Sequence, residues 1–189
     1  MTGIYLTIGI VIALSALGYA FYLYKKVLSF DEGDDKVREI SNYIKEGAQA
    51  FLRSEYKVIY TYIAIASIVI FVGFWIGYDS ISGLTEGSNT NIPIPQHDNS
   101  ALFFALGTSL SFVLGSFFSL FAGFVGMKSA TNANSRTTTA AQKSGMIKAL
   151  DVAFKGGSVM GMGVVGFGLL GLLIVISVSF AFGIHPYEA

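Results

Sequence analysis

Four stretches of this 189-residue chain contain no Asp, Glu, Lys or Arg over a length that can cross a lipid bilayer. They are residues 4–24, 58–78, 101–127 and 156–184. A helix needs roughly 20 apolar residues to span the hydrocarbon layer. Soluble domains carry about 25% charged residues, whereas this chain carries 13%, so a large soluble helical core is a poor alternative. The sequence predicts an all-α integral membrane protein with four transmembrane helices.

The first stretch does not look like a cleaved signal peptide. Such a peptide begins with a basic region and ends at a small-residue cleavage site. Residues 1–4 contain no basic residue, and the apolar run ends at Tyr22, Tyr24, Lys25 and Lys26. Tyr followed by Lys is typical of a membrane interface, so we interpret this stretch as a retained helix.

The basic residues predict the orientation. Seven of the twelve Lys and Arg residues lie in residues 25–57 and the other five in residues 128–155, whereas residues 79–100 and both termini have none. Basic loops stay in the cytoplasm. We therefore expect cytoplasmic segments at 25–57 and 128–155, an outer loop at 79–100, and both termini outside. Residues 1–189 form one multi-pass membrane domain in this interpretation, and the short loops favour a prokaryotic cell (inner) membrane.

The first cytoplasmic segment combines a turn with an amphipathic helix. Residues 30–34, which include Gly33, are typical of a turn. Apolar residues then recur at helical spacing, at Val37, Ile40, Ile44, Ala48, Phe51 and Leu52. No helix breaker precedes Val58, so the pattern predicts one long helix that continues into the second span. A helix lying on the membrane surface is the alternative, but the balanced charge favours projection and packing against protein.

The second cytoplasmic segment begins with a polar run at residues 132–139, which includes Arg136. We interpret this run as a loop with helix caps, with a contact to phosphate as the alternative. Residues 144–154 are again predicted to be helical. Ile147, Leu150 and Phe154 would lie on one face of that helix.

The third and fourth spans are rich in small residues. The third has one at every fourth position, at Gly107, Ser111, Gly115, Ser119 and Gly123, and the fourth contains a GxxxG pair at Gly157 and Gly161. Small faces let helices approach closely, so we expect tight packing inside a larger bundle. No ionisable residue lies near the middle of a span. Since such residues mark ion pathways, these helices should carry no ion-binding carboxylate.

No residue is assigned to a catalytic, cofactor-binding or metal-ligating site. The chain has no Cys, no Walker loop and no HExxH motif, and His97 stands alone in the outer loop. Glu39 and Glu46 would share a helix face but lie about 10 Å apart along it, which is too far to hold one metal ion. We also expect no nucleic-acid partner.

Three segments resemble membrane-bound, ion-pumping pyrophosphatases. Residues 36–59 resemble the family's approach to its second helix, at Ile40, Ile44, Glu46, Gly47, Ala48, Ala50, Phe51, Leu52, Tyr56 and Lys57. Residues 126–141 are similar to the loop after its third helix, at Ala130, Thr131, Ala133, Asn134, Arg136 and Thr137. Residues 148–161, with the sequence KALDVAFKGGSVMG, resemble the start of its fourth helix.

The resemblance implies a homodimer of roughly sixteen-helix subunits that hydrolyses pyrophosphate with Mg²⁺ and pumps H⁺ or Na⁺. It leaves the choice of ion and a requirement for K⁺ open. The family's catalytic motifs lie on later helices, so we expect this chain to be the N-terminal part of a longer pump, in contact with the pump's remaining helices and the bilayer. That part would be inactive alone. The rival interpretation is a stand-alone four-helix structural or assembly subunit, and a reading frame that continues past Ala189 into further helices with Asp-rich cytoplasmic motifs would exclude it.

Overall fold

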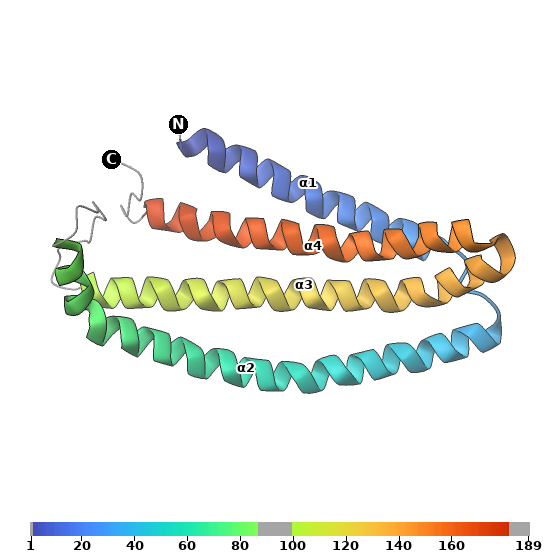
Figure 1. The fold of residues 1–189 in the computed structure, drawn as a ribbon, viewed down its shortest axis with the longest axis horizontal. Coiled ribbons are helices and arrows are strands. Elements are labelled where there is room, and N and C mark those ends of the chain that lie inside the picture. Colours follow the sequence, from blue (N-terminus) through green and yellow to red (C-terminus); the bar gives the residue numbers. More distant parts are fainter. Residues whose placement is uncertain (1, 87–99, 182–189) are drawn as a thin grey trace. The chain divides into compact units, whose positions relative to one another are not determined.

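The computed structural model describes residues 2–86 and 100–181, which form four α-helices (Figure 1). They are α1 (Thr2–Leu28), α2 (Asp35–Glu86), α3 (Ser100–Ser144) and α4 (Met146–Ala181). Most of the predicted outer loop, including His97, lies outside the described residues, as do residues 182–184 of the predicted fourth span. The predicted all-α fold is confirmed.

Each helix contains a stretch that is long and apolar enough to cross a membrane. These stretches are Gly3–Leu28, Asp35–Gly77, Ala101–Ser144 and Met146–Val178. The protein is therefore an integral membrane protein in architecture. Where the membrane boundaries fall along these helices stays a prediction.

The long helix predicted from residue 35 onward is confirmed. α2 runs for 52 residues without a break, because neither Pro nor a turn signal interrupts the sequence between its cytoplasmic segment and its span. The turn predicted at residues 30–34 is also present, and α2 begins directly after it.

The polar run at residues 132–139 is not a loop, so that prediction is wrong. These residues are helical and continue α3. Their side chains bond to carbonyls one turn earlier: Thr137 Oγ1 donates to the carbonyl of Ala133 and Thr138 Oγ1 to that of Asn134. Polar side chains can thus be satisfied without leaving the helix. The chain turns instead at Gly145, which has a φ of +84°.

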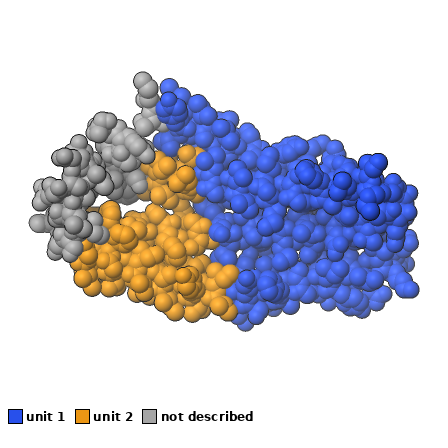
Figure 2. Space-filling view, in the orientation of Figure 1, with its two compact units in different colours: residues 1–57, 118–170 blue, residues 58–117, 171–189 orange. Residues whose placement is uncertain are grey.

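The chain divides into two compact units, which are coloured in Figure 2. Unit 1 comprises residues 1–57 and 118–170, and unit 2 comprises residues 58–117 and 171–189. Within unit 2, Ser109 Oγ donates to the carbonyl of Ser67 at 2.9 Å, and the rings of Phe74 and Phe104 meet edge to face. These contacts join α2 to α3.

α1 packs in unit 1 through a buried face of apolar residues at heptad-like spacing. The buried residues of α1 are Ala13, Ala16, Ala20, Leu23 and Val27, which alternate steps of three and four. On α4, a β-carbon at position 166 would lie 2.6 Å from Leu17 Cδ2 and 3.3 Å from the carbonyl oxygen of Ala13. Glycine at that position lets the backbones of α1 and α4 come close together.

Side-chain hydrogen bonds to backbone carbonyls also link the helices of unit 1. Tyr56 on α2 donates its hydroxyl to the carbonyl of Leu120 on α3 at 2.8 Å. Ser129 on α3 donates to the carbonyl of Gly156 on α4 at 3.1 Å. A β-carbon at Gly156 would crowd that of Ala133. α3 is thus fixed to both of its neighbours in this unit.

The small face predicted for α3 is not used within the described chain. A β-carbon added at Gly107, Gly115 or Gly123 would meet no atom within 4 Å. The packing surface of α3 in unit 1 instead contains Ala122, Gly126, Ser129 and Ala133. Tight packing of the predicted face inside a larger bundle stays a prediction.

Candidate functional site

A group of charged side chains in unit 1 lies around the turn between α1 and α2. Asp31 Oδ1 accepts a hydrogen bond from the backbone amide of Gly33 at 3.0 Å. Gly33 has a φ of +99°, a conformation that side chains disfavour. A β-carbon there would also collide with Thr139 Oγ1 of α3. Glycine is therefore required both by the shape of the turn and by its contact with α3.

Two carboxylates of this turn are paired with basic residues from α2 and α3. Glu32 Oε1 lies 2.6 Å from Lys45 Nζ and 3.6 Å from Arg136 Nη1. Asp31 Oδ2 lies 2.7 Å from Lys143 Nζ. We call these five residues the turn junction. They join three helices, since the turn follows α1, Lys45 belongs to α2, and Arg136 and Lys143 belong to α3.

The pairing shifts the titration of the turn junction. The hydrogen bond from Lys45 lowers the pKa of Glu32, and the charge of Arg136 lowers it further. The hydrogen bond from Lys143 lowers the pKa of Asp31, with help from the Gly33 amide, and the same bond raises the pKa of Lys143. Each charged form is therefore stabilised by its partner.

Unit 1 contains buried polar groups on α2 and α3. Arg136 is only 7% exposed, and its Nη1 also donates to the carbonyl of Asn132 at 2.7 Å. Ser41, Ser135 and Thr139 are buried as well. Among the described residues, the hydroxyls of these three and Nε of Arg136 have no hydrogen-bond partner. Few groups in the described part of the chain therefore compensate the positive charge of Arg136, and they include the carboxylate of Glu32 and the carbonyl of Asn132.

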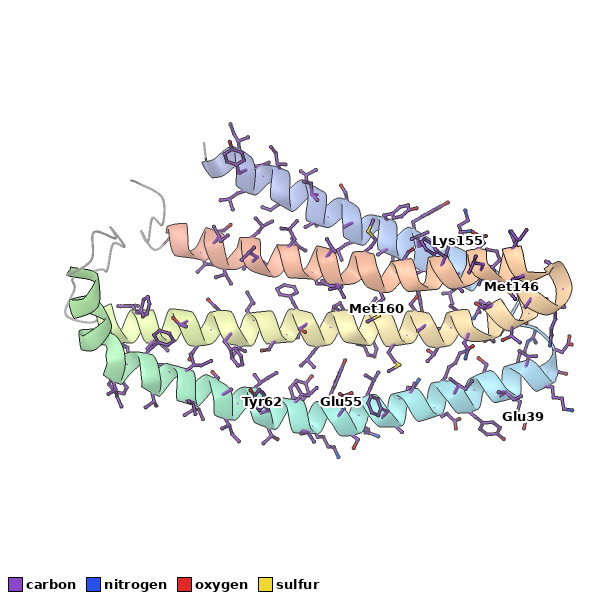
Figure 3. All side chains as sticks on the ribbon, in the orientation of Figure 1. Glu39, Glu55, Tyr62, Met146, Lys155 and Met160 are labelled. Atoms are coloured by element: carbon purple, nitrogen blue, oxygen red, sulfur yellow. The ribbon has the colours of Figure 1, made fainter. Side chains whose placement is uncertain are left out.

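A second charged group lies at the start of α4. Lys155 Nζ is 2.5 Å and Lys148 Nζ is 3.7 Å from the carboxylate of Asp151. Both ammonium groups lie 5.4 Å from the ring of Phe30, which precedes the turn junction. The bond from Lys155 lowers the pKa of Asp151. Lys155 is labelled on α4 in Figure 3.

These groups can hold helices together, but they do not fit a magnesium-pyrophosphate site. Within residues 2–86 and 100–181, no three His, Cys, Asp or Glu side chains gather as a metal site would need. Asp31, Glu32 and Asp151 are each bonded to a Lys or Arg. Glu39 accepts a hydrogen bond from Tyr43 on its own helix. The donor set therefore does not match Mg²⁺, which prefers carboxylates and water in an octahedral arrangement.

The sequence did not reveal the turn junction. Residues 31 and 32 were predicted to lie in a turn, and Arg136 in a loop. Their pairing joins positions that are about 100 residues apart in the chain, which helical periodicity cannot detect. The available signal was the charge of Glu32 and Arg136, because Glu and Arg are seldom buried unless they are paired.

Comparison with known proteins gives a consistent result. The family model described as inorganic H⁺ pyrophosphatase matches residues 14–185. A K⁺-insensitive pyrophosphate-energized proton pump of Chloroflexus aurantiacus is 38% identical over 180 residues, which cover 95% of this chain and 22% of that pump. A K⁺-stimulated pyrophosphate-energized sodium pump of Thermotoga maritima is 36% identical over 165 residues, which cover 87% of this chain and 19% of that pump.

A further proton pump, from Caldanaerobacter subterraneus, is 37% identical over 174 residues, or 90% of this chain and 22% of the pump. The chain thus spans about a fifth of the length of these relatives. The match includes all three segments in which the sequence resembles ion-pumping pyrophosphatases. The chain therefore belongs to the inorganic H⁺ pyrophosphatase family.

Proposed function

We propose that this chain forms the N-terminal part of a pyrophosphate-energised ion pump, in which it supports catalytic helices without supplying catalytic residues. The relatives are pumps of which it matches about a fifth. The observation that carries the supporting role is the state of its carboxylates, because those of the turn junction are engaged by Lys45, Arg136 and Lys143. Phosphoryl transfer needs metal ions and a positioned nucleophile.

Magnesium would then be held by residues outside this chain, as would the pyrophosphate. The names of the relatives include both proton and sodium pumps, and both K⁺-insensitive and K⁺-stimulated ones. The groups that select between these ions would lie on the remaining helices of the pump. The contacts between the two subunits of a homodimer would lie there as well.

Activity should require both parts of the pump. The purified 189-residue chain, incubated with Mg²⁺ and pyrophosphate, should release no phosphate above a blank. Membranes that contain this chain together with the rest of the pump should hydrolyse pyrophosphate, whereas membranes with the rest alone should not. Hydrolysis by the isolated chain would contradict a supporting role. Inactive membranes that contain both parts would favour a stand-alone structural subunit.

We also propose that both termini lie outside the cell and that the turn junction faces the cytoplasm, since all twelve Lys and Arg residues fall in residues 25–57 and 128–155 and basic segments stay in the cytoplasm. The test is single-Cys labelling of intact cells with an impermeant maleimide, which the absence of native Cys simplifies. Cys at Ser88 should react from outside. Cys at Gln142, which is exposed near the end of α3, should react only after the cells are opened. Reaction of both from outside would overturn the topology.

A further inference from the structure

α4 carries two rows of residues on opposite sides. The buried row in unit 1 alternates steps of three and four residues, at Ala149, Val152, Gly156, Val159, Gly163 and Gly166. This spacing is that of a helix packed along a neighbouring helix. α1 and α3 occupy this side, since Gly166 meets Leu17 and Gly156 meets Ala133.

The second row repeats the same spacing on the open side of α4. We call it the open seam, and its members are Ile147, Leu150, Phe154, Gly157, Gly161, Val164 and Gly168. It begins two residues before the buried row, and two residues turn a helix by about 200°. Ile147, Leu150 and Phe154 are 89%, 65% and 76% exposed. A β-carbon at Gly157, Gly161 or Gly168 would meet no atom within 4 Å.

Lipid does not suit the first two turns of the open seam. Ile147, Leu150 and Phe154 alternate along the helix with Lys148, Asp151 and Lys155. Three charged residues in these turns place them outside the hydrocarbon layer, where apolar side chains would face water unless protein covers them. Farther along, glycine offers little contact to lipid and weakens a helix, but it allows another helix to come close.

We propose that the open seam of α4 docks an apolar helix from the part of the pump outside these 189 residues. The inference rests on the proposed function, since the relatives have about four-fifths of their length elsewhere. Bulky residues of the docked helix would lie over Gly157 and Gly161, and its apolar end would cover Phe154. A second copy of α4 suits the seam less well, because a twofold axis along the membrane normal would bring Lys148 and Lys155 of both copies to the same levels.

Water accessibility of the seam in the complete pump is the first test. Leu150→Cys and the control Gln142→Cys are each made as the only cysteine and treated with a water-soluble maleimide. Position 142 should react at least tenfold faster than position 150, and denaturation should abolish the difference. Equal rates in a pump that still hydrolyses pyrophosphate would overturn the seam and leave the proposed function intact, whereas failure of hydrolysis in the unmodified pump would contradict the proposed function itself.

The identity of the occupant is the second test. A photoreactive phenylalanine analogue replaces Phe154, the complete pump is illuminated, and the products are mapped by mass spectrometry. The expected product joins residue 154 to a peptide from outside residues 1–189 of the same subunit. A covalent dimer through residue 154 would show that a second copy occupies the seam. A lipid adduct as the only product would show that lipid covers it, and either result would overturn the proposal.

Discussion

Replacing Gly166 with Leu should strongly destabilise the packing of α1 on α4. Any β-carbon at this position would overlap the side chain of Leu17 and approach the carbonyl oxygen of Ala13. Leu17 can rotate, but the Ala13 carbonyl belongs to a helix backbone and can move only if all of α1 moves. Overpacking of this kind costs about 3 kcal/mol. The expected result is a lower midpoint of thermal unfolding for the 189-residue chain in detergent micelles, followed by circular dichroism.

Gly18→Leu is the matched control. It makes the same substitution on α1, at an exposed position where a β-carbon would meet nothing within 4 Å. Its effect should be small. Equal midpoints for Gly166→Leu and Gly18→Leu would mean that α1 does not pack on α4 through this contact.

Glu32→Gln should be the second most damaging substitution. It removes the carboxylate nearest to Arg136, which is 7% exposed and would keep its charge. The substitution also removes the charge from the hydrogen bond that Lys45 donates to Glu32, and a hydrogen bond to a charged group contributes about 2 kcal/mol. The ion pair with Arg136 at 3.6 Å is lost as well, and a charge left buried increases the cost. Arg136→Met should be milder, because Glu32 would still be bonded to Lys45 at 2.6 Å and its side chain is 27% exposed. The same unfolding measurement checks this order.

Glu39→Gln is the control for charge, since the one side-chain hydrogen bond of Glu39 within residues 2–86 and 100–181 comes from Tyr43, one turn along its own helix. Acid provides an independent check. The folded-state pKa values of Asp31 and Glu32 are lowered, so their contribution to stability is complete above the unfolded-state pKa and is lost as pH falls through the folded-state pKa. The unfolding midpoint should therefore decline below about pH 5, and less steeply in Glu32→Gln. If Arg136→Met lowered the unfolding midpoint more than Glu32→Gln does, the loss of Glu32 would not be the more costly change, and the proposed dependence of Arg136 on Glu32 would be contradicted.

The positions of the long uncharged runs were sufficient to predict the four helices but not where each helix ends. The four uncharged runs and the uninterrupted pattern from Val37 to Leu52 predicted α1 to α4 and the unbroken α2. The prediction of a loop at residues 132–139 was wrong because composition alone favours a loop there. Thr and Asn side chains bond to carbonyls of their own helix instead, and the turn occurs at Gly145, a glycine placed where helices commonly end.

The candidate site was harder to predict than the helices, for a geometrical reason. Glu32 and Arg136 meet because α2 and α3 run antiparallel in unit 1, and nothing local in either segment specifies its partner. Glycine spacing has the same limit. Gly157 and Gly161 were visible as a pair in the sequence, yet Gly156 and Gly166 make the contacts within unit 1. A periodic pattern shows that one face of a helix consists of small residues. Only the fold shows which helix lies against that face.

The single residue between α3 and α4 has a consequence for the order of assembly. Because Gly145 alone separates Ser144 from Met146, the bond between Ser129 and Gly156 closes a segment of 27 residues, at a small cost in chain entropy. The contact of Leu17 with Gly166 instead spans most of the chain. Of the two helices, α1 precedes α4 in the chain, so Leu17 and Ala13 can make this contact only after Gly166 has been synthesised. Closing it costs more chain entropy than closing the α3–α4 hairpin, because the loop is longer.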